Sequence, residues 1–185
     1  MHFYCEKCKK EYPLNSISYR CSCGGLFRLY KSADDKIPIS VSIGEIKTPM
    51  LPADFAGLGK VFLKLEHLQA TGSFKARGAY ALINQLKYLR INRIVEDSSG
   101  NSGAAIAAYA AAADIKCDIY VPTGISARKL HFIETFGAQV HFESDREEAG
   151  KAARAAAHDI YYASHIYNPL FFEGISTLAY EIYEQ

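Results

Sequence analysis

From about residue 60 onward, short runs of β-branched and other apolar residues alternate with longer stretches in which apolar residues recur at helical spacing. This alternation is typical of βαβ units, in which helices connect the parallel strands of one sheet. It therefore predicts an α/β fold. We expect strands over residues 61–66, 93–97, 118–121, 139–142 and 160–162, and helices over residues 73–88, 102–113, 127–136, 145–158 and 170–184.

Local signals support the expected helices. Two alanine-rich stretches, residues 104–113 and 152–157, favour helix and permit close packing on a sheet. Gly137 suits the end of one helix, and Asp145 can cap the start of the next. The last helix runs to the final residue without a stop signal, so we expect a truncated sequence, a split gene or a partner chain that supplies the remainder.

Composition narrows the classes of partner. With 185 residues, of which 49% are hydrophobic, the chain can bury a sizeable core. The net charge is only +1, so the overall field does not favour nucleic acid, an anionic membrane or a polyanionic substrate. We find neither a stretch of ~20 apolar residues nor a signal peptide at the start, and we expect a cytoplasmic protein.

Residues 1–30 contain four of the five cysteines and are expected to form a zinc-ribbon-like segment. Cys5 and Cys8 form one pair, Cys21 and Cys23 form another, and twelve residues separate the two pairs. This spacing lets two turns bring four thiolates around one tetrahedral zinc ion, which would be structural because no coordination position stays open. Cys117 lies in an apolar run and is not expected to bind the metal.

Two alternatives remain for this segment. It could be a metal-free remnant of a ribbon, or a module that docks on protein or nucleic acid. The basic residues around the cysteines add some positive charge, but no wider basic surface accompanies them. These residues are Lys7, Lys9, Lys10 and Arg20.

Lys75 stands at the expected opening of a helix, after a strand and a turn that contains Gly72. A lysine held there and partly desolvated can act as an amine nucleophile toward an aldehyde, because desolvation lowers its pKa. Gly78 permits close approach of backbone or cofactor, and Arg77 adds a fixed charge. The alternative is a solvated helix lysine.

Residues 98–103, Ser-Ser-Gly-Asn-Ser-Gly, occupy a second junction between an expected strand and helix. Backbone amides at a helix start, together with hydroxyls and flexible glycines, can bind a carboxylate or phosphate. The alternative is a helix start without a ligand.

Together these segments resemble the fold-type II pyridoxal-phosphate enzymes, such as threonine synthase and threonine dehydratase. The motif Ser-Phe-Lys-x-Arg-Gly-Ala at residues 73–79 is followed, about 25 residues later, by Ser-Ser-Gly-Asn-x-Gly-x-Ala at residues 98–105. The cysteine pairs and the later Asn168-Pro169, Glu173-Gly174 and Thr177 narrow the resemblance to the threonine synthase family. It implies a three-layer parallel sheet of the kind found in the tryptophan synthase β subunit.

The resemblance also implies roles for individual residues. Lys75 would bind pyridoxal 5'-phosphate covalently through its amine and later move protons, while Phe74 packs nearby and Asn101 hydrogen-bonds the ring hydroxyl of the cofactor. The same loop would bind the α-carboxylate of an amino-acid substrate. The residues implied for that contact are Ser98, Ser99, Gly100, Asn101, Ser102 and Gly103.

The sequence departs from the family pattern in two places. No glycine-rich loop for the cofactor phosphate follows Lys75, and no hydroxyl side chain for the pyridine nitrogen can be assigned. Phe171 stands where threonine synthases often have an arginine that suits a phosphorylated substrate. Nearby basic residues that could compensate are Arg128, Lys129, His131 and His165.

These observations lead to the hypothesis of a lyase for amino-acid biosynthesis, which makes threonine from O-phosphohomoserine by elimination and water addition. Alternatives are serine or threonine dehydration, replacement at the β-carbon, and a non-catalytic half-enzyme or docking module. We expect residues 31–85 and 166–185 to belong to an incomplete large domain and residues 86–165 to form a small αβ domain. The expected partners are an amino-acid substrate, a second copy of the chain and a separate chain that completes the fold, with neither nucleic acid nor membrane.

Overall fold

The computed structural model describes residues 1–55, 57 and 59–185, and its centre is a four-stranded parallel sheet. The strand order is β8–β7–β6–β9, and every neighbouring pair is parallel. The expected strands between residues 93 and 162 are therefore present, with small shifts at their ends. Their bounds are Arg93–Glu96 for β6, Lys116–Pro122 for β7, Gln139–Glu143 for β8 and Tyr161–Tyr162 for β9.

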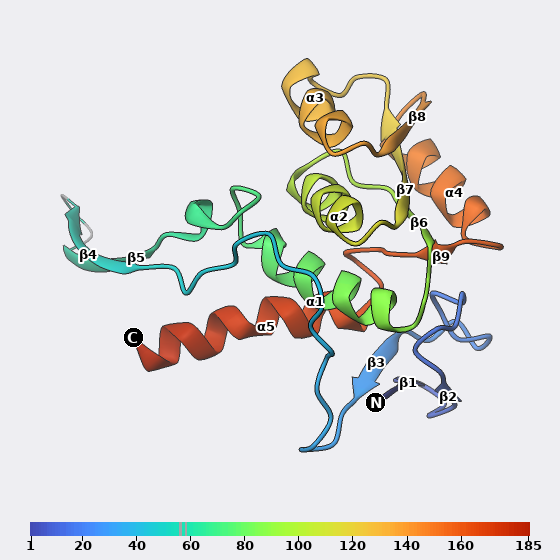
Figure 1. Cartoon of the computed structure of the whole chain (residues 1–185), viewed down its shortest axis with the longest axis horizontal. Coiled ribbons are helices and arrows are strands. Elements are labelled where there is room, and N and C mark those ends of the chain that lie inside the picture. The colour runs from blue at the N-terminus through green and yellow to red at the C-terminus, as the bar shows by residue number, and fades with distance from the viewer. Residues whose placement is uncertain (56, 58) are drawn as a thin grey trace.

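Helices cover both faces of this sheet (Figure 1). On one face lie α2 (Asn101–Ala112) and α3 (Ala127–Thr135), and on the other lies α4 (Arg146–Ala156). Alternate residues of β6 separate the two cores, because Ile94 packs in the larger cluster with α2 and Val95 in the smaller cluster with α4. Of the described residues, no helix is long and apolar enough to cross a membrane.

The remaining two long helices, α1 (Lys75–Tyr88) and α5 (Pro169–Glu184), pack against each other below the sheet (Figure 1). Glycines permit their close contact. A Cβ atom added to Gly174 would lie 2.1 Å from the carbonyl oxygen of Arg77 and 2.8 Å from the Cβ of Ala81. One added to Gly78 would lie 2.7 Å from the ring of Phe171, so Gly78 makes room for this ring.

A buried cluster of charges joins these helices to the segment that precedes α1. Arg77 binds Glu66 at 2.8 Å and Glu181 at 2.7 Å, and Lys64 binds Glu181 at 2.7 Å. The neighbouring guanidinium of Arg77 lowers the pKa of Glu181 to about 2. The sequence could not predict this ion pair between α1 and α5, because Arg77 and Glu181 are 104 positions apart.

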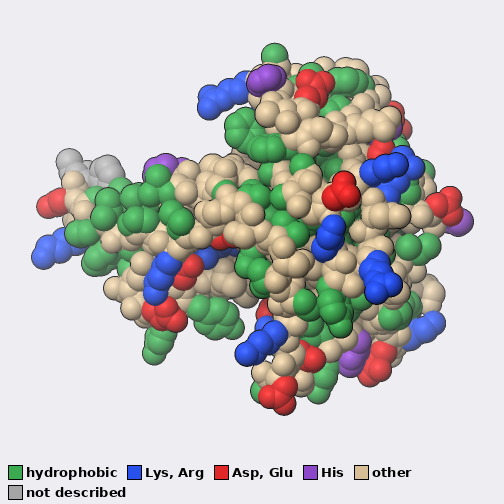
Figure 2. Space-filling model, in the orientation of Figure 1, with side chains coloured by type: hydrophobic (Ala, Val, Ile, Leu, Met, Phe, Trp, Pro, Cys, Tyr) green, Lys and Arg blue, Asp and Glu red, His purple; other side chains and the backbone are tan. Residues whose placement is uncertain are grey.

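The strand expected over residues 61–66 does not join the parallel sheet, which corrects that part of the prediction. It is β5 (Gly59–Lys64), and it forms an antiparallel hairpin with β4 (Met50–Phe55). The hairpin projects from the body of the molecule (Figure 1), and hydrophobic side chains cover much of it in Figure 2. Leu51, Phe62 and Leu63 are 48%, 67% and 40% exposed. A 3-10 helix, η1 (Glu66–Leu68), separates the hairpin from the turn before Lys75.

The N-terminal segment folds as a three-stranded antiparallel sheet in the order β2–β1–β3. The hydroxyl of Tyr161 donates to the carbonyl oxygen of Leu14, and the ring of Tyr19 packs on Tyr162 and Tyr167. The segment is thereby attached to β9 and to the loop before α5. Its strands are His2–Cys5 for β1, Glu11–Tyr12 for β2 and Phe27–Tyr30 for β3.

The helix crossing can be tested with Gly174→Ala. The added methyl group cannot be accommodated without separating α1 and α5, so we expect a loss of about 1–3 kcal/mol in the free energy of unfolding, despite the better helix propensity of alanine. Urea denaturation followed by circular dichroism measures this loss. Gly124→Ala is the matched control, since nothing lies within 4 Å of its added Cβ, and equal stability of the two variants would contradict the prediction.

Candidate functional site

Lys75 is the first residue of α1, as the sequence predicted within two residues. The turn before it contains Gly72, whose φ of 72° lies in the left-handed region that favours glycine. The hydroxyl of Ser73 accepts a hydrogen bond from the backbone nitrogen of Lys75. The ammonium group lies 4.5 Å from the ring centre of Phe74 and 5.9 Å from that of Phe171. Two aromatic rings therefore lie near this amine, and none of the ion pairs found among the described residues involves it.

The loop formed by residues 98–103 leads from β6 into α2. Gly100 is the N-cap residue, and no side chain caps the helix or places an acidic group in its first turn. The start of α4 differs, because the carboxylate of Asp145 accepts hydrogen bonds from the amides of Glu147 and Glu148, as predicted. The first amides of α2 thus remain available to an anion.

Gly103 holds the loop close to the helix. A Cβ atom at this position would lie 2.0 Å from the carbonyl oxygen of Ser98, which no other residue type could accommodate without a backbone shift. The amide of Gly100 also donates to the hydroxyl of Ser98, at 3.3 Å. Ser98 and Ser102 are buried and Asn101 is exposed, so the loop presents Asn101 outward from a fixed base.

A cavity of about 330 Å³ joins the two motif segments. Gly72 comes from the turn before Lys75, and Gly100 and Asn101 come from the start of α2. Lys75 and Phe74 do not line this cavity, nor do Ser98, Ser99, Ser102 and Gly103. Its lining consists of Thr71, Gly72, Gly100, Asn101, Ala104, Ser126, Arg128, Lys129 and Phe132.

Thr71 belongs to this lining and was not singled out in the sequence. Its hydroxyl is buried and has no hydrogen-bond partner within the part of the chain that the structure describes. A buried hydroxyl without a partner is costly, which favours a ligand with a polar group at this point. Its position directly before Gly72, in the turn that leads to Lys75, was the available signal.

The start of α3 supplies the other wall of the cavity. Arg128 and Lys129, whose positions the sequence could not assign, both lie there, and both side chains are exposed. His131 and His165 are not part of the lining. Phe171 is also absent from it: the ring is 1% exposed and packs in the crossing of α1 and α5. Phe171 therefore lies near the amine of Lys75 but does not form a wall of this cavity.

The four N-terminal cysteines come together as the spacing predicted. The Sγ atoms of Cys5 and Cys23 are 3.5 Å apart, those of Cys8 and Cys21 are 3.4 Å apart, and all four lie within 4.8 Å of one another. The backbone amide of Cys23 and then the hydroxyl of Tyr12 lower the pKa of the Cys21 thiol to about 6. Cys117 is buried elsewhere, in β7.

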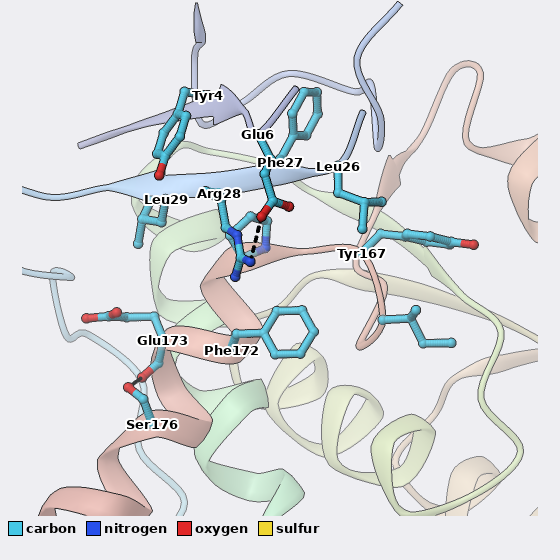
Figure 3. A pocket seen from close by; sticks show the side chains of 12 residues that line it. Tyr4, Glu6, Leu26, Phe27, Arg28, Leu29, Tyr167, Phe172, Glu173 and Ser176 are labelled. Carbon is cyan, nitrogen blue, oxygen red and sulfur yellow. Dashed lines mark hydrogen bonds and ion pairs between the residues drawn. The ribbon is translucent and has the colours of Figure 1, made fainter. Parts of the chain in front are cut away.

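A larger cavity, about 430 Å³, lies between the N-terminal sheet and the start of α5. Figure 3 shows Phe172 and Glu173 of α5 facing Leu29 and the ion pair of Arg28 with Glu6 across it. None of its lining residues belongs to the segments around Lys75 or Asn101. The two motif segments therefore do not contribute to this cavity.

Comparison with known proteins shows the family to which the chain belongs. Residues 41–185 match the family described as "Pyridoxal-phosphate dependent enzyme", so the chain belongs to this family of enzymes. Among its members, the threonine synthases resemble this chain over most of its length. The resemblance inferred from the two motifs is thereby confirmed.

Two threonine synthases illustrate the extent of this similarity. That of Methanocaldococcus jannaschii is 28% identical over 215 residues, covering 98% of this chain and 53% of that protein. That of Bacillus sp. (strain ULM1) is 35% identical over 173 residues, covering 87% of this chain and 48% of that protein. The chain spans about half the length of the curated relatives it matches.

Solved structures share the fold. A pyridoxal 5'-phosphate-dependent aspartate racemase superposes with a TM-score of 0.67 at 29% identity, covering 76% of this chain and 46% of that one. Diaminopropionate ammonia lyase from Escherichia coli superposes with a TM-score of 0.69 at 21% identity, covering 78% of this chain and 49% of that one. The expected fold-type II architecture is thus confirmed for the parallel sheet and its helices.

Proposed function

We propose that this chain contributes the amine, the carboxylate-binding loop and the cavity beside Asn101 to a threonine synthase-like lyase. The reaction is conversion of O-phosphohomoserine to threonine and phosphate, by elimination followed by addition of water. The observation that carries the proposal is the shared cavity, to which the turn before Lys75 and the start of α2 both contribute.

The residues fit pyridoxal phosphate at its reactive end. Lys75 offers an amine for the aldehyde, Asn101 offers an amide for the ring hydroxyl, and the unpaired hydroxyl of Thr71 offers a further polar contact. The cofactor supplies an electron sink for a carbanion when bound. Ser98, Ser99, Ser102 and Gly103 would position the substrate carboxylate together with Gly100 and Asn101, through the uncapped start of α2.

Lys75 would then take the proton from the α-carbon of the substrate. The rings of Phe74 and Phe171 limit access of water to this amine on two sides. Phe74 is 37% exposed, so it can also contact a ligand.

Full activity would need a cradle for the cofactor phosphate and a partner for the pyridine nitrogen, and neither can be assigned among the described residues. We propose that the other half of the fold supplies these groups, from a separate chain or the same one, and that the complete protein is a homo-oligomer. The projecting hairpin supports this view. Two strands alone are marginally stable, and they expose Leu51, Phe62 and Leu63.

Arg128 and Lys129 support a phosphorylated substrate, since both basic groups line the cavity beside Asn101. The second candidate function is serine or threonine dehydration, or replacement at the β-carbon. The sequence supports that alternative, because Phe171 stands where threonine synthases often have arginine, but its buried ring does not line the cavity. The two candidates differ in their need for the basic pair on α3.

We also propose that Cys5, Cys8, Cys21 and Cys23 hold one structural zinc ion. Four sulfur atoms within 4.8 Å of one another suit tetrahedral coordination after a small contraction. Gly25 permits this approach, because a Cβ atom there would lie 2.5 Å from the Sγ of Cys5.

The role of Lys75 predicts the site of a covalent adduct. After incubation of the chain with pyridoxal phosphate and reduction with borohydride, peptide mass mapping should find the reduced cofactor on Lys75. Lys75→Ala should lose the adduct, whereas Lys129→Ala should keep it, because the control lysine lines the cavity without serving as the nucleophile. A principal adduct on another lysine would overturn the assignment.

Substrate choice can be tested in the enzyme completed with the other half of the fold. Replacing both Arg128 and Lys129 by alanine should lower kcat/KM for O-phosphohomoserine by about ten- to a hundredfold, because a charge-assisted contact to the phosphate is lost. The kcat/KM values for serine and threonine should not change. Lys151→Ala on α4 is the control. Preference for serine or threonine in the unmodified enzyme would support the second candidate function instead.

Zinc content gives a separate test. Protein purified without oxygen should contain about one zinc per chain by metal analysis, because four closely spaced thiolates bind this metal strongly. Cys8→Ser should reduce the content, and Cys117→Ser should not. A metal-free protein, or equal loss in both variants, would contradict the proposal.

A further inference from the structure

A second group of metal-binding side chains lies at the end of β6. Glu96 is the last residue of that strand, Asp97 follows it, and His165 comes from the loop between β9 and α5. One ligand atom of each residue lies within 4.8 Å of those of the other two. The Nδ1 of His165 and the Oε1 of Glu96 are 2.5 Å apart.

Only one of the two carboxylate oxygens of Glu96 has a hydrogen-bond partner among the described residues. The residue is 0% exposed, and its second oxygen, Oε2, is buried without a hydrogen-bond partner among residues 1–55, 57 and 59–185. Burial of an unpaired carboxylate oxygen is costly, and in proteins it is usually relieved by a donor or a metal ion. This oxygen belongs to the same carboxylate that contacts His165, so it lies within the cluster.

The surrounding charges leave the cluster negative. Asp97 is 4% exposed and accepts a hydrogen bond from the hydroxyl of Tyr162 at 2.8 Å. The guanidinium of Arg146 lies 3.5 Å from its other oxygen, but this arginine side chain is 48% exposed. Two carboxylates thus lie beside one half-exposed arginine and one imidazole. A bound cation would neutralise the remaining negative charge.

We propose that Glu96, Asp97 and His165 bind a divalent transition-metal cation of the Mn²⁺ type, at a site separate from the four cysteines. Two carboxylates and one imidazole suit such an ion, whereas the thiolate cluster prefers zinc. Ligands at ~2.1 Å from one ion lie about 3 to 4.2 Å apart. Binding would therefore widen the 2.5 Å contact between Glu96 and His165 and draw the most distant ligand atoms about half an ångström closer. His165 is 16% exposed, and water can occupy the remaining coordination positions from its side.

A bound ion would join two parts of the chain near the segment formed by residues 98–103. Asp97 directly precedes Ser98, and His165 lies in the loop that leads to Asn168 at the start of α5. The ion would fix the end of β6 against this loop. It would therefore stabilise the base of the segment formed by residues 98–103 without contacting the cavity beside Asn101.

The experiment titrates the zinc-loaded chain with Mn²⁺ and follows free Mn²⁺ by electron paramagnetic resonance. We expect binding of about one Mn²⁺ per chain and a higher midpoint of thermal unfolding in its presence. Glu96→Gln and His165→Gln should each weaken Mn²⁺ binding by at least about tenfold, the effect expected even for loss of an outer contact to a metal ligand.

The exposed pair of His158 and Asp159 supplies the matched control. Both side chains are 88% exposed, and Asp159→Asn should leave Mn²⁺ binding unchanged. Circular dichroism checks that each variant is folded, and Asp97→Asn replaces Glu96→Gln if the latter fails to fold, since asparagine still accepts from Tyr162. The proposal would be overturned if Mn²⁺ did not bind stoichiometrically, or if binding survived all ligand substitutions. A proton on Glu96 would then be the means of neutralising the cluster.

Discussion

The close crossing of α1 and α5 is the contact on which the rest of the site depends. Gly174 brings the two backbones together, and Gly78 admits the ring of Phe171 between them. The centre of the same ring lies 5.9 Å from the ammonium group of Lys75, which precedes Gly78 by one turn of α1. The packing that stabilises the helix pair thus also fixes the direction in which the proposed nucleophile leaves α1, and a change in this crossing would move the amine.

The sequence predicted those parts of the fold that are determined locally. The alternation of apolar runs located the strands and helices between residues 93 and 162, and Asp145 identified the start of α4. The motif residues around Lys75 and Asn101 were found because each lies at a junction of a strand or turn with a helix. Such junctions are readable without knowledge of distant contacts, since glycine and small polar residues mark them.

Other features depend on contacts between distant residues and could not be predicted. The segment formed by residues 61–64 has a strand pattern, but the pattern does not state whether its partner is parallel or antiparallel. The lining of the cavity by Arg128 and Lys129 follows from the packing of α3 on α2, and the burial of Phe171 follows from a glycine on another helix. The division into an incomplete large domain and a small αβ domain stays a prediction.

The attachment of the N-terminal sheet has a consequence for the order of folding. Its three strands are close in sequence, so this segment can fold soon after it leaves the ribosome. Its contact with the rest of the molecule must wait, because Leu14 binds Tyr161, 147 positions later, and Tyr19 packs on Tyr167. The first part of the chain to be synthesised is therefore among the last to reach its final place, and until then the aromatic surface of β9 and the loop before α5 is open to other contacts.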